Sequence, residues 1–118
     1  MELIPAILVK DEAAFHARLA LVEGLVPIVH LDVMDGAFVP NYSWFDTAAL
    51  RELETAVVFE LHLMVKDPTR YIEETREIEK IVRVIWHVEA ECRHEALIKR
   101  CRDQGKEAGL ASNQKWAI

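Results

Sequence analysis

The stretch Val26–Met34, with the sequence VPIVHLDVM, is an almost continuous apolar run that is interrupted by one histidine and one aspartate. Such a run is typical of a strand that is buried on both faces of a helix-covered parallel sheet. Because side chains alternate along a strand, His30, Asp32 and Met34 share one face. A loop containing Gly and Pro over Asp35–Trp44 ends the strand.

The same alternation of apolar runs and amphipathic stretches continues through the chain. Strands are predicted over Leu3–Val9, Val26–Met34, Val57–Val65, Ile81–Val88 and Glu107–Ser112, and helices over Asp11–Val22, Asp46–Leu53, from Asp67 onward and over Arg93–Gln104. Repeated strand–helix units predict an α/β fold with right-handed crossovers, either an open doubly wound sheet or part of a (β/α) barrel. The phosphate-binding glycine patterns of nucleotide-binding open sheets are missing after these strands, which favours the barrel. We expect a single domain over residues 1–118, because no linker divides the chain.

Two further predicted strands carry a histidine and an acid two residues apart, Glu60 with His62 and His87 with Glu89. The carboxyl ends of neighbouring parallel strands meet at one end of the sheet, where barrel active sites lie. One buried histidine beside an acid is commonplace and structural. Three such pairs in register would leave several polar groups buried without partners, at about 1–3 kcal/mol each. A shared ligand or metal explains the pattern better.

We assign His30, Asp32 and His62 as candidate metal ligands. Imidazole and carboxylate ligands suit Zn²⁺, Fe²⁺, Mn²⁺ or Co²⁺ rather than Ca²⁺. The sequence therefore predicts one divalent transition metal as the cofactor.

Other residues on the same faces have two open interpretations. Glu60, His87 and Glu89 either act in the site or support its ligands from behind. Met34 and Met64 are either ordinary core residues or a polarisable wall of the site.

The stretch His30–Asn41, with the sequence HLDVMDGAFVPN, closely resembles the second-strand signature of ribulose-phosphate 3-epimerases. Leu61–Val65, LHLMV, followed by Pro68, resembles their third-strand signature. His87–Ala90 and Gly109–Ala111 resemble the fourth and fifth strands more loosely. The resemblance covers essentially the whole chain but only the first half of the family's barrel.

This resemblance implies a half-length (β/α) barrel of the ribulose-phosphate-binding type, with four to five strand–helix units. It implies an enzyme that interconverts ribulose 5-phosphate and xylulose 5-phosphate with a divalent metal and two aspartates. Removal of the C3 proton gives an enediolate that the metal stabilises, and inversion needs a second acid on the opposite face. His30, Asp32 and His62 match three of the family's four metal-ligand positions, and Asp32 matches one of its two acid/base positions. The substrate-binding or pocket residues that we expect are Met34, Met64, His87 and Glu89.

The chain departs from the family pattern at several points. Ala6 replaces a serine that contacts substrate, Tyr42–Phe45 replaces a smaller Gly-containing stretch, and Asn113–Gln114 replaces an Asn-Pro pair. The family's second catalytic aspartate lies on the seventh strand, and its phosphate-binding glycines follow strands six to eight. The 118 residues contain neither, so we expect weakened turnover.

A full barrel takes about 200–250 residues. Three interpretations of the shorter chain stay open: a piece of a longer epimerase, a half barrel that closes with a second copy, or a non-catalytic half barrel that binds a metal or sugar phosphate and self-associates. Open sheet edges favour pairing with another chain, so we expect a homodimer or higher oligomer. The fifth strand complicates closure, because four strands from each chain already make eight.

Composition limits the partners. The chain has 14 Lys and Arg against 20 Asp and Glu, a net charge of −6, which argues against nucleic acid as a partner. No apolar run approaches the roughly 20 residues that span a membrane, and the N-terminus lacks a signal-peptide layout. The spacing of Cys92 and Cys101 fits neither a zinc site nor a redox pair. We expect reduced thiols and a cytoplasmic protein.

Overall fold

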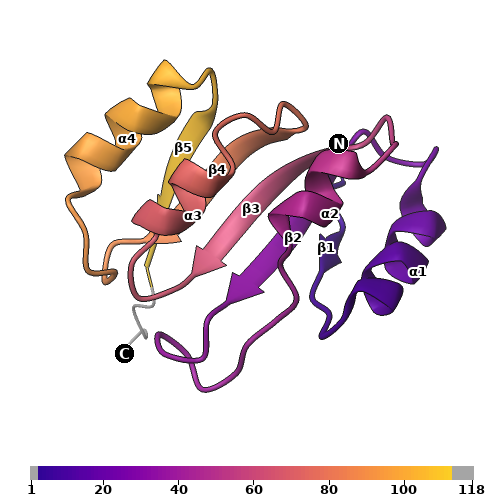
Figure 1. Cartoon of the computed structure of the whole chain (residues 1–118), viewed down its shortest axis with the longest axis horizontal. Helices are drawn as coiled ribbons and strands as arrows, with labels where there is room; N and C mark the ends of the chain where they lie inside the picture. The colour runs from indigo at the N-terminus through magenta and orange to yellow at the C-terminus, as the bar shows by residue number, and fades with distance from the viewer. Residues whose placement is uncertain (1–2, 113–118) are drawn as a thin grey trace.

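The computed structural model describes residues 3–112, in which strands and helices alternate along the chain (Figure 1). The elements are β1 (Ala6–Ile7), α1 (Glu12–Val22), β2 (Ile28–Met34), α2 (Thr47–Glu52), β3 (Val58–Met64), α3 (Thr69–Glu74), β4 (Ile81–His87), α4 (His94–Asp103) and β5 (Glu107–Ala111). The strands form one sheet in the order β1-β2-β3-β4-β5, and all neighbours are parallel. This arrangement confirms the α/β fold and fits part of a (β/α) barrel.

The helix ends follow local sequence signals. The side chains of Asp11 and Asp46 accept hydrogen bonds from the backbone N–H groups of Ala14 and Ala49, which caps α1 and α2. Gly105 follows α4 with a φ of +77°, a left-handed conformation that favours glycine and stops the helix. The capping aspartates place the helices at the ends that the sequence predicts.

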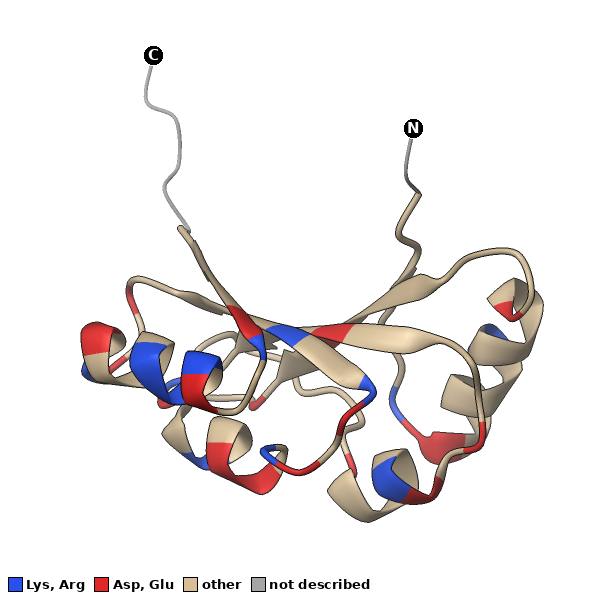
Figure 2. Ribbon diagram, turned by 90° about the horizontal axis from the view of Figure 1, so that it is seen from above, with Lys and Arg blue, Asp and Glu red and all other residues tan. Residues whose placement is uncertain are grey.

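The two faces of the sheet differ. On β2, Val29, Leu31 and Val33 are at most 1% exposed, whereas His30 and Asp32 are only partly buried. Figure 2 shows that the helices of the described part of the chain lie on one side of the sheet. The apolar core therefore fills the space between sheet and helices, and the opposite face carries the polar side chains.

The first predicted strand is wrong in its length. We predicted Leu3–Val9, but β1 contains only Ala6 and Ile7. Proline has no N–H to give to a ladder, and Pro5 contributes only its carbonyl, to the N–H of His30. The carbonyl of Val9 accepts from Trp44 in the loop after β2 instead of continuing the strand.

The fifth strand lies in the sheet, parallel to β4. The buried Nζ of Lys106, one residue before β5, donates to the carbonyls of Thr75, Ile78 and Ile81. Gly109 lies so close to Ile85 that an added Cβ would approach its Cγ1 to 3.3 Å. These contacts hold β5 beside β4, so closure of an eight-stranded barrel from two copies would require one strand of each copy to leave its sheet.

Some sequence predictions concern other features of the chain. None of the described helices is long and apolar enough to cross a membrane. Cys92 and Cys101 are both free thiols. Asn113–Gln114 lies outside the described residues.

Candidate metal centre

The three predicted metal ligands lie on two neighbouring strands. His30 and Asp32 are on β2, and His62 is on β3 directly opposite Asp32 in the parallel register. Their side chains are 16–22% exposed on the face of the sheet that the helices leave open. Parity along each strand and this register together bring the three residues to one place.

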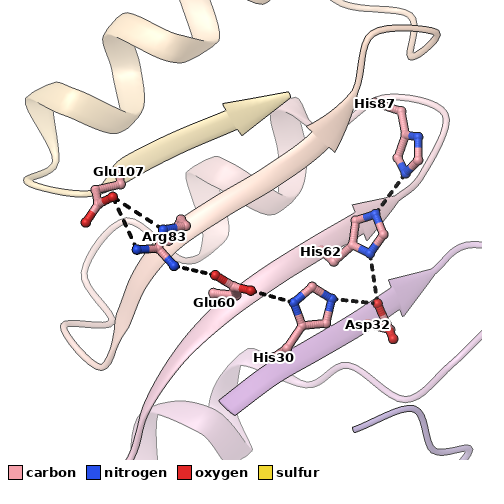
Figure 3. A network of polar contacts seen from close by, with 7 residues as sticks. All are labelled: His30, Asp32, Glu60, His62, Arg83, His87 and Glu107. Carbon is pink, nitrogen blue, oxygen red and sulfur yellow. Dashed lines mark hydrogen bonds and ion pairs between the residues drawn. The ribbon is translucent and has the colours of Figure 1, made fainter. Parts of the chain in front are cut away.

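One nitrogen of each histidine is directed at the same carboxylate oxygen. His30 Nε2 lies 3.0 Å and His62 Nδ1 lies 2.9 Å from Oδ1 of Asp32 (Figure 3). One donor atom from each of the three residues lies within 4.8 Å of the others, so the group can hold a metal ion. Two imidazoles and a carboxylate are a ligand set for zinc and related transition metals. The residues present therefore fit a divalent metal.

The second nitrogen of each histidine also has a partner. His30 Nδ1 lies 2.7 Å from Oε1 of Glu60, and His62 Nε2 lies 2.9 Å from Nε2 of His87. The rings of His62 and His87 stack with their centroids 5.0 Å apart. Partners of this kind orient metal-binding histidines and fix which nitrogen is free for the metal.

The hydrogen bonds outweigh burial in setting the charges of the acids. Burial alone would raise the pKa of Asp32, but its bonds to His30 and His62 lower that pKa far below its ordinary value. Burial would also raise the pKa of Glu60, which the bonds from His30 and Arg83 instead lower. The bond to Asp32 raises the pKa of His30, although burial opposes it. Both acids are therefore ionised at neutral pH and attract cations.

His87 lies at the end of β4 and is 5% exposed. Its pKa is lowered by burial and by the nearby His62. Its Nδ1 has no hydrogen-bond partner and lies 3.8 Å from Oε1 of Glu89, while the ring of Phe38 packs at a centroid distance of 5.3 Å. Glu89 lies beyond the end of β4 and accepts a hydrogen bond from Ser112. The predicted strand Ile81–Val88 is one residue longer than β4, so Glu89 lies beyond the strand, but its side chain still lies beside that of His87.

The prediction of unpaired polar groups was also wrong. Glu60 bonds to His30 of the neighbouring strand. Asp32 bonds to His62 of the neighbouring strand and to His30 of its own strand. These side chains therefore satisfy one another. Among the described buried side-chain atoms, only His87 Nδ1 and Gln104 Oε1 have no hydrogen-bond partner. A metal is therefore not needed to give these polar groups hydrogen-bond partners. The prediction of a metal site is supported instead by the two histidine nitrogens that lie at Asp32 Oδ1.

Met34 and Met64 lie next to the candidate ligands. Met34 and Met64 are opposite each other in the register, one position beyond the Asp32 and His62 pair on the same face. Both are partly buried. Ala6, on the edge strand β1, lies opposite His30 in the register. Its side chain is a methyl group where the resemblance implies a serine.

Sequence reasoning missed two contributors to the site. Ser43 Oγ donates to the carbonyl of Asp32 and accepts from the N–H of Met34, which ties the loop after β2 to the strand that carries His30 and Asp32. Arg83 contacts Glu60 from β4. Arg83 could have been found, because it has the same strand parity as His87 within an otherwise apolar run.

A model of the ribulose-phosphate 3 epimerase family matches residues 2–118. The chain belongs to the ribulose-phosphate 3-epimerase family. This membership confirms the resemblance that the second- and third-strand signatures carry.

Curated relatives agree with this membership. The chain is 37% identical over 112 residues to a ribulose-phosphate 3-epimerase of Treponema pallidum, and the aligned residues cover 92% of this chain and 50% of the relative. It is 34% identical over 117 residues to a ribulose-phosphate 3-epimerase of Bacillus subtilis, which covers 96% of this chain and 52% of the relative. The chain thus spans about half the length of these relatives.

Proposed function

We propose that the chain carries the metal-binding half of a ribulose-phosphate 3-epimerase type of active site. The reaction of such a site is metal-assisted abstraction of the C3 proton of a pentulose 5-phosphate, followed by return of a proton to the opposite face of C3, which interconverts ribulose 5-phosphate and xylulose 5-phosphate. The observation that supports it most strongly is the convergence of His30 Nε2 and His62 Nδ1 on one oxygen of Asp32. The ligands are His30, Asp32 and His62, and the metal is zinc, iron, manganese or cobalt.

Asp32 is the proposed base. It is ionised at neutral pH, as a proton acceptor must be. Both histidine contacts go to Oδ1, so Oδ2 is the oxygen that we propose as the proton acceptor. A divalent metal at this position would supply Lewis-acid stabilisation of the negative charge that develops on the sugar oxygens. Met34, Met64, His87 and Glu89 are the proposed substrate contacts around Asp32.

The second acid is the weak point of this half site. Glu60 is the other carboxylate bonded to His30, but its two oxygens are occupied by His30 and Arg83. It is therefore a poor proton donor for the opposite face of C3. We infer that the 118-residue chain exchanges the C3 proton but epimerises slowly.

The test follows exchange and epimerisation separately. Metal-loaded protein is incubated with ribulose 5-phosphate in heavy water, and deuterium at C3 and xylulose 5-phosphate are measured by NMR. We expect deuterium to enter at C3 much faster than xylulose 5-phosphate forms, because Asp32 returns a deuteron to the face that it deprotonated. Metal binding without either reaction would contradict the catalytic proposal and favour a non-catalytic half barrel that binds a metal or sugar phosphate. Epimerisation as fast as exchange would show that a second acid is supplied.

We further propose that another copy of the chain covers the open face of the sheet and its two edges. The supporting observations are the polar face without helices and the unpaired outer edges of β1 and β5 in the described residues. The position of β5 beside β4 argues against simple closure of four strands on four. The proposed setting is the cytoplasm, where a sugar phosphate is the partner and neither nucleic acid nor membrane is expected.

Light scattering tests this association. We expect a mass of at least two copies of the 13.5 kDa chain at micromolar concentration, because exposed parallel edges pair readily. A mass of 13.5 kDa as the sole species across that range would contradict self-association.

A further inference from the structure

A row of charged side chains crosses the open face of the sheet at the level of His30. The register places His30 of β2 opposite Glu60 of β3, Glu60 opposite Arg83 of β4, and Arg83 opposite Glu107 of β5. Each neighbouring pair is in contact, so the row runs from the candidate metal ligand to the far strand (Figure 3). Positive and negative groups alternate along it.

Glu60 is held at both of its oxygens. Oε1 lies 2.7 Å from His30 Nδ1, and Oε2 accepts from Nη1 of Arg83 at 2.5 Å. The side chain of Glu60 is only 10% exposed. A carboxylate that is bonded on both sides cannot rotate without losing one of its partners, so Arg83 fixes the direction from which Glu60 meets the imidazole.

Arg83 is in turn held from the other side. Its Nε and Nη2 both lie 3.3 Å from Oε2 of Glu107. Glu107 is 71% exposed, and Arg83 is 29% exposed. Ion pairs with so much exposure contribute little to stability, so stabilisation of the fold does not account for the arrangement well. Its clearest consequence is at the imidazole of His30.

The orientation of His30 decides whether it can bind a metal with Asp32 and His62. With Nδ1 bonded to Glu60, Nε2 is the nitrogen directed at Asp32. If Glu60 were free to turn, the ring of His30 could rotate and carry Nε2 away from that position. A carboxylate partner behind a metal-binding histidine restricts this motion and keeps the proton on the nitrogen that faces away from the metal, which is Nδ1 in His30.

We propose that Arg83 is a positioning residue of the metal centre, which acts through Glu60 to hold His30 with Nε2 toward Asp32 and His62. The inference rests on the proposed function in its choice of metal ligands. β4 therefore contributes to the centre without supplying a ligand, and Glu107 on β5 supports Arg83 from the far side.

The test compares Arg83→Met with Arg70→Met in the full 118-residue chain. Arg70 is a matched control, because it also pairs with a glutamate, Glu74, but on the exposed surface of α3. Zinc affinity is measured by competition with a chromophoric chelator. Replacement of partners behind a ligand typically costs 10–100-fold in affinity, and we expect a loss in that range for Arg83→Met and none for Arg70→Met. Wild-type affinity in Arg83→Met would overturn the proposal.

A second readout needs no metal. In the metal-free protein, the Nδ1–H proton of His30 is expected to be sheltered from exchange by its bond to Glu60, and NMR reports its rate of exchange with water. We expect at least a tenfold faster exchange in Arg83→Met and an unchanged rate in Arg70→Met. An unchanged rate in Arg83→Met would overturn the proposal even if the wild-type chain bound no zinc, whereas absence of zinc binding alone would overturn the proposed function.

A double-mutant cycle tests the route through Glu60. Glu60→Gln is expected to lose zinc affinity by the same 10–100-fold, and Arg83→Met should then cause no further loss, because residues that act through one another are not additive. Additive losses would overturn the proposed route. If Arg83→Met does not fold, Glu60→Gln still decides the question, since wild-type affinity and exchange in that variant would leave Arg83 nothing through which to act.

Discussion

Replacement of His62 by alanine is expected to lower the affinity for zinc by more than 100-fold. The change removes one of the three proposed ligands, and losses from supporting residues behind a ligand already reach 10–100-fold. It also removes the bond that His87 makes through Nε2. The affinity is measured by chelator competition, and circular dichroism checks that the fold is kept.

His16→Ala is the matched control for this prediction. His16 is a histidine on the exposed surface of α1, where it pairs with Glu12 one turn away. We expect its substitution to leave zinc affinity and stoichiometry unchanged. Full zinc affinity in His62→Ala would show that the assignment of His62 as a ligand is wrong.

Replacement of Asp32 by asparagine is expected to slow C3 exchange of ribulose 5-phosphate by about 10²–10⁴-fold, the usual contribution of a positioned general base. The amide keeps the shape of the carboxylate but cannot take up the proton. The rate of deuterium incorporation is measured at metal concentrations that saturate each variant, so that a weaker metal site does not imitate the loss of the base.

Asp46→Asn provides the comparison, because Asp46 caps α2 and asparagine caps a helix equally well. Its exchange rate should equal that of the wild-type chain. Exchange at the wild-type rate in Asp32→Asn would mean that another group removes the proton.

The spacing of apolar residues and the alternation of side chains along the strands predicted most of the fold. The near-continuous apolar runs identified β2, β3 and β4 to within two residues at each end. Such runs also predicted a sheet covered by helices on both faces, whereas the helices of residues 3–112 lie on one side of the sheet. The pattern failed at β1, where Pro5 and the contact of Val9 with the loop shorten the strand. Such contacts join segments that are far apart in the sequence, so no local pattern reports them.

The arrangement of the site residues was also only partly predictable from the sequence. Parity placed His30 and Asp32 on one face, but it did not determine which residues of β3 would lie opposite them. The register decides that Glu60 lies opposite His30 and His62 lies opposite Asp32. The shortest contacts between these histidines and acids therefore join two strands, whereas the sequence pattern suggested pairs within each strand.

The contact of Arg83 on β4 with Glu60 was not predicted, for another reason. The pairing of β3 with β4 shifts register between Phe59 and Glu60, which sets Arg83 beside Glu60. A shift of this kind follows from the packing of the two strands together. Residue types alone indicated a charged side chain in an apolar strand, but not its partner.

The proposed function requires that His30, Asp32 and His62 hold one divalent metal on the open face of the sheet. Anomalous diffraction at the zinc absorption edge, from crystals of the zinc-loaded chain, tests it most directly. We expect one strong peak within about 2.0–2.2 Å of His30 Nε2, a carboxylate oxygen of Asp32 and His62 Nδ1. A zinc-loaded crystal whose peaks all lie away from these three side chains would contradict it.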